Sequence, residues 1–209
     1  MERNEILDLY TKRYNFLVEA AKDLKSDLTN TFDNILRTEI HIDRIDTRAK
    51  GIAKFVDKAL KEKDGNLKYQ NPINEIQDQI GARILVLYLK DVENVGKRIH
   101  DYYTNFEDIN KEPDNDHEFK YFGRHMILTM PQEIRDKYGK ENIPVVFELQ
   151  IKTLFQYAWS ECEHDLNYKH IEGGELGKEE QRLLALSSAQ SWGSDKIFDE
   201  LLTKIQKFK

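Results

Sequence analysis

Apolar residues recur along the chain with two spacings, one typical of helices and one typical of strands. Apolar side chains that lie three or four positions apart form one face of an amphipathic helix. This spacing predicts helices over residues 2–34, 50–62, 91–103, 153–169 and 178–207. The first of these segments has room for one long helix or for two.

Strands are predicted where apolar and polar residues alternate, or where a short apolar run is bounded by turn residues. These patterns occur over residues 38–46, 82–89, 120–130 and 143–151. The run ARILVLYL, residues 82–89, is almost entirely apolar. Such a run favours a strand that is buried on both faces.

The segments between these elements are rich in polar and turn-forming residues. Residues 63–72 contain Gly, Asn and Pro, and residues 105–119 are polar and acidic, so both are predicted to be loops. The composition of the second loop also favours mobility. A further connection is expected from the end of the third strand to about residue 143.

Because helices alternate with strands, we expect an α/β (α+β) fold in which helices pack on a central sheet. A length of 209 residues suits one domain over 1–209. Within it we expect an N-terminal helical region over 1–36, a core over 37–170 that carries the site, and a C-terminal helix over 178–207.

Composition narrows the classes of function. The net charge of −6 argues against broad nonspecific binding of nucleic acid, although it leaves room for a local basic site. No apolar run approaches the ~18 residues of a membrane span, and the charged N-terminus has no signal-like apolar stretch. We therefore expect a soluble, cytoplasmic protein without a membrane partner. The single cysteine, Cys162, excludes an intrachain disulfide and is expected to pack in the core beside Trp159 and Leu166.

A first cluster with chemical potential is basic and lies at the start of the second predicted helix. Lys50, Lys54 and Lys58 are spaced four residues apart and come directly after Arg48 and Ala49. Like charges at this spacing repel by a few tenths of a kcal/mol per pair, and a bound triphosphate would relieve that repulsion. A lysine face in contact with water is the alternative interpretation.

A second cluster, DQIGAR, leads into the apolar run. Asp78 immediately precedes the strand, where a short carboxylate can hold a divalent metal, and Gly81 lets the backbone come close to a ligand. Arg83 begins an apolar strand, where an unpaired charge is costly. A turn followed by a structural ion pair would explain the same residues.

A third cluster, EFKYFGRH, lies in the third predicted strand. Tyr121, Gly123 and His125 alternate, so they share one face of that strand. A tyrosine ring can stack on a nucleobase, and a histidine can donate to a phosphate or ribose oxygen. An exposed aromatic patch is the alternative.

A fourth cluster lies in the last predicted strand. Its period of two places Glu148 and Gln150 on the face opposite Phe147 and Leu149. Magnesium is commonly bound by one or two carboxylates together with phosphate oxygens, which makes Asp78 and Glu148 a candidate pair. Glu148 could also accept a proton from an attacking hydroxyl. Carboxylates that simply face water remain the alternative.

Together these clusters provide charge neutralisation, a metal site and a platform for a base, which are the parts that phosphoryl-type transfer needs. The sequence contains neither a GxxxxGK[ST] loop nor a Cys/His pattern for zinc.

The motifs resemble those of the synthetase domain of RelA/SpoT-type enzymes, and particularly the small alarmone synthetases. The pattern R-x-K-x-x-x-S-F-x-x-K matches RAKGIAKFVDK, with Lys54 in place of the serine. D-x-x-G-x-R matches DQIGAR, and E-x-Q-I-[RK]-T matches ELQIKT. The helix pattern W-x-E-x-E-H-x-x-x-Y-K matches WSECEHDLNYK. The resemblance covers about residues 40–170.

The resemblance implies a mixed sheet like that of nucleotidyltransferases and an enzyme that transfers pyrophosphate from ATP to the 3′-hydroxyl of GDP or GTP. It implies Mg²⁺ as cofactor, bound by Asp78 and Glu148, with Glu148 also activating the hydroxyl. The resemblance assigns ATP binding to four residues: Arg48, Lys50, Lys58 and Arg83. It assigns acceptor binding to three others: Tyr121, His125 and Gln150. Three residues of the following helix would support the site: Glu161, Glu163 and His164.

The departures from the family pattern lie on the acceptor side. The usual G-Y-x-S-x-H is KYFGRH here, and the basic stretch that usually precedes it is acidic. Two alternatives therefore stay open: a toxic relative that modifies the 3′-CCA end of tRNA or an adenine nucleotide, and an inactive nucleotide-sensing module. A neutralising antitoxin and a homo-oligomer formed through the apolar face of the final helix also stay open as partners.

Overall fold

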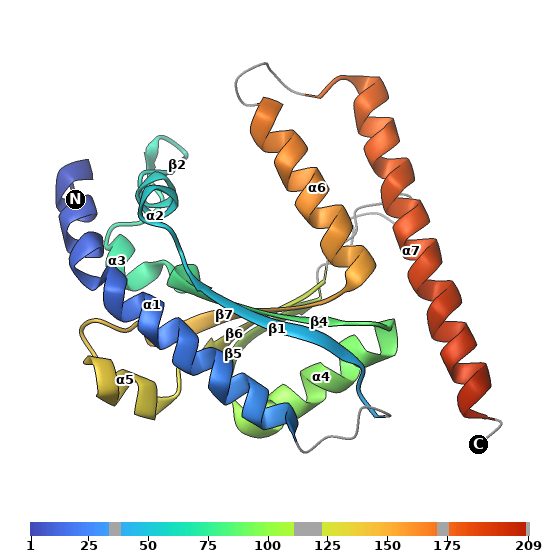
Figure 1. The fold of residues 1–209 in the computed structure, drawn as a ribbon. Helices are drawn as coiled ribbons and strands as arrows, with labels where there is room; N and C mark the ends of the chain where they lie inside the picture. Colours follow the sequence, from blue (N-terminus) through green and yellow to red (C-terminus); the bar gives the residue numbers. More distant parts are fainter. Residues whose placement is uncertain (34–38, 111–122, 171–175, 208–209) are drawn as a thin grey trace.

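The computed structural model describes residues 1–33, 39–110, 123–170 and 176–207 (Figure 1). A five-stranded sheet lies at its centre, in the order β1-β4-β7-β6-β5. The bounds of these strands are β1 Ile42–Ala49, β4 Ile80–Val86, β7 Val146–Thr153, β6 Arg124–Thr129 and β5 Asn105–Asn110. Only β4 and β7 pair in parallel, and the other neighbours are antiparallel. The expected mixed central sheet is therefore confirmed.

Helices cover both faces of this sheet, as Figure 1 shows. The longer helices are α1 Arg3–Asp33, α2 Ile52–Ala59, α4 Leu89–Tyr102, α5 Gln132–Tyr138, α6 Leu154–His170 and α7 Lys178–Gln206. In the figure α4 and α5 lie below the sheet, whereas α2 and α6 lie above it. Helix α1 packs along β1 as one continuous helix.

The alternation in β7 separates the core from the opposite face of the sheet. Phe147, Leu149 and Ile151 are fully buried, and the Phe147 ring meets Tyr103 at the end of α4 edge to face. Glu148 and Gln150 alternate with these residues and point to the opposite face of the sheet. The period of two thus places the hydrophobic core below the sheet and the polar pair above it.

Helix α7 folds back beside α6 and is fixed to the end of β7. The Thr153 hydroxyl donates to the buried Asp195 carboxylate at 2.5 Å, and the Phe155 and Phe198 rings stack 6.0 Å apart. Large apolar side chains on α7 nevertheless remain exposed: Leu183, Leu186, Trp192, Ile197, Phe198, Leu201 and Ile205. The helix therefore packs on its own chain, and the homo-oligomer stays a prediction.

Two of the predicted connections contain a regular element that was not expected. The polar segment at 105–110 was expected to be a loop but forms β5, because an edge strand pairs through its backbone and needs few apolar side chains. Residues 111–119 of that loop lie outside the described residues. The connection after β6 contains helix α5, which sequence patterns missed.

Smaller differences concern the elements between α2 and β4. The predicted loop at 63–72 contains a hairpin, β2 Glu62–Lys63 and β3 Asn66–Leu67, which turns through Asp64 and Gly65 at positive φ. A short helix, α3 Pro72–Glu75, and the 3₁₀ turn η1 Gln77–Gln79 follow. The first strand begins and ends a few residues later than predicted.

Cys162 is exposed on α6, which corrects the expectation that it packs in the core. Its predicted neighbour Leu166 is also exposed, whereas Trp159 is buried. Within the described part of the chain, no helix combines the length and the apolar character that a membrane span requires.

Candidate active site

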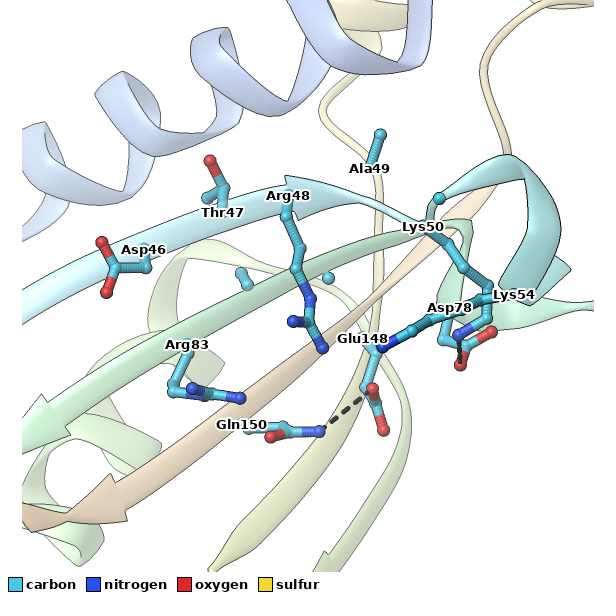
Figure 2. A pocket seen from close by; sticks show the side chains of 13 residues that line it. Asp46, Thr47, Arg48, Ala49, Lys50, Lys54, Asp78, Arg83, Glu148 and Gln150 are labelled. Carbon is cyan, nitrogen blue, oxygen red and sulfur yellow. Dashed lines mark hydrogen bonds and ion pairs between the residues drawn. The ribbon is translucent and has the colours of Figure 1, made fainter. Parts of the chain in front are cut away.

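A cavity of about 380 Å³ opens on the face of the sheet that carries Glu148 and Gln150, at the end of β1 and the start of α2 (Figure 2). Three strands, the β1–α2 junction and the turn before β4 provide its walls. The lining residues are Asp46, Thr47, Arg48, Ala49, Lys50, Gly51, Lys54, Asp78, Gly81, Ala82, Arg83, Glu148 and Gln150.

Strand register brings distant parts of the sequence together on the floor of this cavity. Arg48 of β1 pairs with Gly81 of β4, and Gly81 in turn pairs with Glu148 of β7. A Cβ atom built at Gly81 would meet nothing within 4 Å, so the missing side chain leaves open space between Arg48 and Glu148. The next pair along, Arg83 and Gln150, extends the same floor.

Asp78 accepts hydrogen bonds from two lysines. The Nζ atoms of Lys50 and Lys58 each lie 2.8 Å from its Oδ2 atom. Burial raises the pKa of the Asp78 carboxyl, but the two lysine hydrogen bonds outweigh it, so the pKa lies below its ordinary value. Asp78 is therefore ionised at neutral pH.

Glu148 is held by its neighbours on the same face. Its Oε1 lies 3.2 Å from Nδ1 of His125, and its Oε2 accepts a hydrogen bond of 3.2 Å from Gln150. Burial raises the pKa of Glu148 and the negative charge of Asp78 adds to that, but the contact with His125 lowers the pKa below its ordinary value overall. The sheet thus presents a second ionised carboxylate within electrostatic reach of the first.

These two carboxylates fit a magnesium ion. The Oδ1 atom of Asp78 is buried and has no hydrogen-bond partner among the described residues, so a carboxylate oxygen is available for a ligand. No group of three acidic, His or Cys side chains in the described ranges is arranged to hold a metal unaided. Magnesium usually takes one or two protein carboxylates and completes its shell with phosphate oxygens and water.

Arg83 reaches the cavity from β4 and is fixed by α6. Its Nη2 atom lies 3.1 Å from Oε1 of Glu161, and its guanidinium carbon lies 4.6 Å from the centre of the Tyr157 ring. Arg44 approaches the same ring at 5.3 Å. Glu161 was expected to support the site, and it does contact a lining residue. Sequence patterns gave no signal for Tyr157, because it lies between the two matched motifs, ELQIKT and WSECEHDLNYK, and belongs to neither.

The backbone of Lys50 is fixed by two hydrogen bonds. The Tyr10 hydroxyl of α1 donates to the Lys50 carbonyl at 2.8 Å, and the Lys50 amide donates to the Gln79 carbonyl at 2.8 Å. The Tyr10 ring is buried and stacks on Phe55 of α2 at 3.7 Å. Burial raises the pKa of Tyr10 strongly, so its hydroxyl remains a donor. Nothing in the local sequence marked Tyr10 for this contact.

The structure brings most of the predicted site residues together. Those that line the cavity are Arg48, Lys50, Asp78, Arg83, Glu148 and Gln150. Lys58 and His125 contact it through Asp78 and Glu148, respectively. Tyr121 lies outside the described residues. Lys54 also lines the cavity, although the sequence did not single it out from its neighbours as a site residue.

Comparison with known proteins gives consistent matches. The chain is 23% identical over 160 residues to GTP pyrophosphokinase YwaC of Bacillus subtilis (strain 168), covering 75% of this chain and 72% of that protein. Its fold matches the crystal structure of small alarmone synthetase 1 from Bacillus subtilis with a TM-score of 0.73 and 20% identity, over 98% of this chain and 97% of that chain.

The same synthetase has been solved bound to its product pppGpp, with a TM-score of 0.69 and 19% identity, over 93% of this chain and 95% of that chain. A third structure holds AMPCPP, with a TM-score of 0.65 and 20% identity, over 93% and 94%. These likenesses agree with the expected synthetase fold, a mixed sheet flanked by helices. Residues 47–173, more than half of the chain, match the family described as the region found in RelA / SpoT proteins. The chain therefore belongs to this RelA/SpoT family.

Proposed function

We propose that the chain is an ATP-dependent pyrophosphokinase that transfers the β,γ-pyrophosphate of ATP to the 3′-hydroxyl of GDP or GTP, forming (p)ppGpp. The observation that carries the proposal is one cavity that combines basic side chains with two ionised carboxylates, Asp78 and Glu148. Family membership and relatives named GTP pyrophosphokinase and alarmone synthetase support the same reaction. The whole chain would act as one synthetase domain.

On the donor side, basic residues would neutralise the polyphosphate. Arg48 and Lys50 lie at the end of β1. Lys58 lies on α2 and contacts Asp78. Charge-assisted hydrogen bonds of this kind are the strong ones in proteins, because both partners are ionised. Tyr157 covers one face of the Arg83 guanidinium. The opposite face would contact the nucleoside part of ATP.

On the acceptor side, Glu148 would accept the proton of the 3′-hydroxyl. The 3′-oxygen then forms a bond to the β-phosphorus of ATP, the bond from that phosphorus to the α–β bridging oxygen breaks, and AMP leaves. His125 and Gln150 orient the carboxylate in the absence of substrate. Gln150 and His125 would also line the acceptor pocket, together with Tyr121.

Asp78 and Glu148 would hold the magnesium ion, whose positive charge would reduce the repulsion between the donor phosphates and the incoming oxygen. Lys50 and Lys58 keep Asp78 ionised before the ion arrives. The same two lysines lie beside the carboxylate that would hold the ion, and they would also contact the donor phosphates there.

The test is an acceptor panel with terminally labelled ATP and magnesium, offering GDP, GTP, ADP, AMP and deacylated tRNA separately. Label in a guanine nucleotide is the expected result. Label on tRNA or on an adenine nucleotide would contradict the proposed acceptor while leaving the donor reaction intact. Binding of ATP without transfer to any acceptor would instead indicate a nucleotide-sensing module. An antitoxin partner stays a prediction.

A further inference from the structure

The cations around the cavity divide into two groups according to their partners. Lys50 and Lys58 both bind Asp78, and Arg83 binds Glu161. Arg48 and Lys54 line the cavity without an ion pair to any residue that the structure describes. Among the described residues that line the cavity, the positive charge that is not already paired with a carboxylate therefore lies on these two side chains.

Lys54 is exposed, and its place in the cavity lining is what distinguishes it from a lysine that only faces water. Asp57, three residues further along α2, would be the natural partner on the helix surface, but it lies 3.5 Å from Arg3 of α1. Figure 2 shows the Lys54 side chain extending from α2 into the cavity beside Asp78 and Glu148. The ammonium group of Lys54 thus lies in the same cavity as the two carboxylates, where the proposed function places the polyphosphate of the donor.

Lys54 also stands where the family pattern has a serine. A serine hydroxyl is short and uncharged, whereas a lysine carries a full charge on a flexible four-carbon stem. In this chain the position therefore gains both reach and charge. We propose that Lys54 binds the terminal phosphates of the donor, and that it makes donor affinity depend on the length of the polyphosphate. This inference rests on the proposed function, since it assigns one further residue to the same donor site.

The experiment measures binding in the absence of turnover. The probe is an ATP analogue with an α,β-methylene bridge, in which the bond that breaks during transfer is replaced. ADP and AMP serve as shorter probes. Isothermal titration with magnesium compares the unchanged protein with Lys54→Ser, Lys54→Arg and the control Lys61→Ser. Lys61 is exposed, lies just beyond the end of α2 and does not line the cavity.

Loss of one charge-assisted contact weakens binding by roughly tenfold or somewhat more. We expect that loss for the ATP analogue with Lys54→Ser, a smaller loss for ADP, and unchanged binding of AMP. Lys54→Arg should retain most of the affinity, and Lys61→Ser all of it. The affinity of Lys54→Ser should also depend less steeply on salt, because one cation has been removed.

Equal affinity of Lys54→Ser and the unchanged protein for the ATP analogue would overturn the inference. An equal loss of affinity for AMP would also overturn it, because it would indicate a contact with the nucleoside. If the analogue does not bind the unchanged protein at all, the inference and the proposed donor both fail. If it binds and Lys54→Ser weakens it, but no acceptor receives label, the inference stands and only the proposed transfer fails.

Discussion

Arg83 and Tyr157 form a cation–π pair across the junction of β4 and α6, with 4.6 Å between the guanidinium carbon and the ring centre. Glu161, one helical turn beyond Tyr157, fixes the edge of the same guanidinium at 3.1 Å. The Nε atom of Arg83 is buried and has no hydrogen-bond partner among the described residues. The orientation of Arg83 in the cavity is therefore set by α6 rather than by its own strand.

Replacing Tyr157 should weaken donor binding without slowing the chemical step. A cation–π contact contributes about 0.5–2 kcal/mol, so Tyr157→Leu should raise the KM for ATP roughly twofold to thirtyfold. Tyr157→Phe keeps a ring and should restore most of the affinity. Steady-state kinetics with varied ATP at saturating acceptor would measure the KM and kcat separately.

A matched control exists on α4, where Arg98 lies 4.5 Å from the centre of the exposed Tyr102 ring. This pair has a similar geometry but does not line the cavity. Tyr102→Leu should therefore leave the KM for ATP unchanged. A fall in kcat with an unchanged KM for Tyr157→Leu would show that the ring has a different role.

The sequence predicted the faces of β7 correctly because the side-chain period of a strand is rigid. Glu148 and Gln150 had to share a face once a strand was assigned, and their position opposite the buried Phe147 follows from the pattern. The convergence of Lys50 and Lys58 on Asp78 could not be predicted in the same way. It depends on how α2 is oriented against the turn before β4, and this orientation is set by contacts of Phe55 with Tyr10, far away in the sequence.

Gly123 should resist replacement by the serine of the family pattern. A Cβ atom at this position would collide with the carbonyl oxygen of Ile151 and with the Lys152 side chain, because β7 runs directly against it. The backbone oxygen cannot move without disturbing the sheet. Gly123→Ser should lower the free energy of unfolding by about 1–3 kcal/mol, typical of overpacking, as measured by chemical denaturation.

Gly193 provides the opposite case. It lies inside α7, and a Cβ atom there would meet nothing within 4 Å. Gly193→Ala should raise the stability by up to about 1 kcal/mol, since alanine favours a helix more than glycine does. Equal stability of Gly123→Ser and the unchanged protein would mean that the chain can accept the family serine after all.

Asp108 should make the stability of the β5–β6 edge depend on pH. Arg124 of β6 donates to Oδ1 of Asp108 at 2.8 Å, and Nε2 of His100 from α4 lies 2.8 Å from Oδ2. The hydrogen bond from Arg124 lowers the pKa of Asp108, burial opposes this, and His100 lowers it further, so the pKa falls below its ordinary value. A lowered carboxyl pKa stabilises the folded state above the unfolded pKa, about 3.9.

That contribution is lost as the pH falls through the lowered pKa. Asp108→Asn should therefore be less stable than the unchanged protein at pH 7, and the two should converge below about pH 4. Thermal melts across this range would measure the difference. Asp101 is exposed at the end of α4 and has no ion pair within the described ranges, so Asp101→Asn should show no such convergence. A constant gap between Asp108→Asn and the unchanged protein at every pH would contradict the account.

The most direct test of the proposed reaction compares ATP binding and pyrophosphate transfer in the unchanged protein and in Glu148→Gln. The substitution keeps the size of the side chain, and its contact with Gln150 can be retained, but it removes the group that would accept the 3′-hydroxyl proton. The account predicts that the unchanged protein forms (p)ppGpp from GDP or GTP. It also predicts that Glu148→Gln binds the methylene analogue of ATP while its transfer falls at least about a hundredfold. Transfer by Glu148→Gln at the rate of the unchanged protein would contradict it.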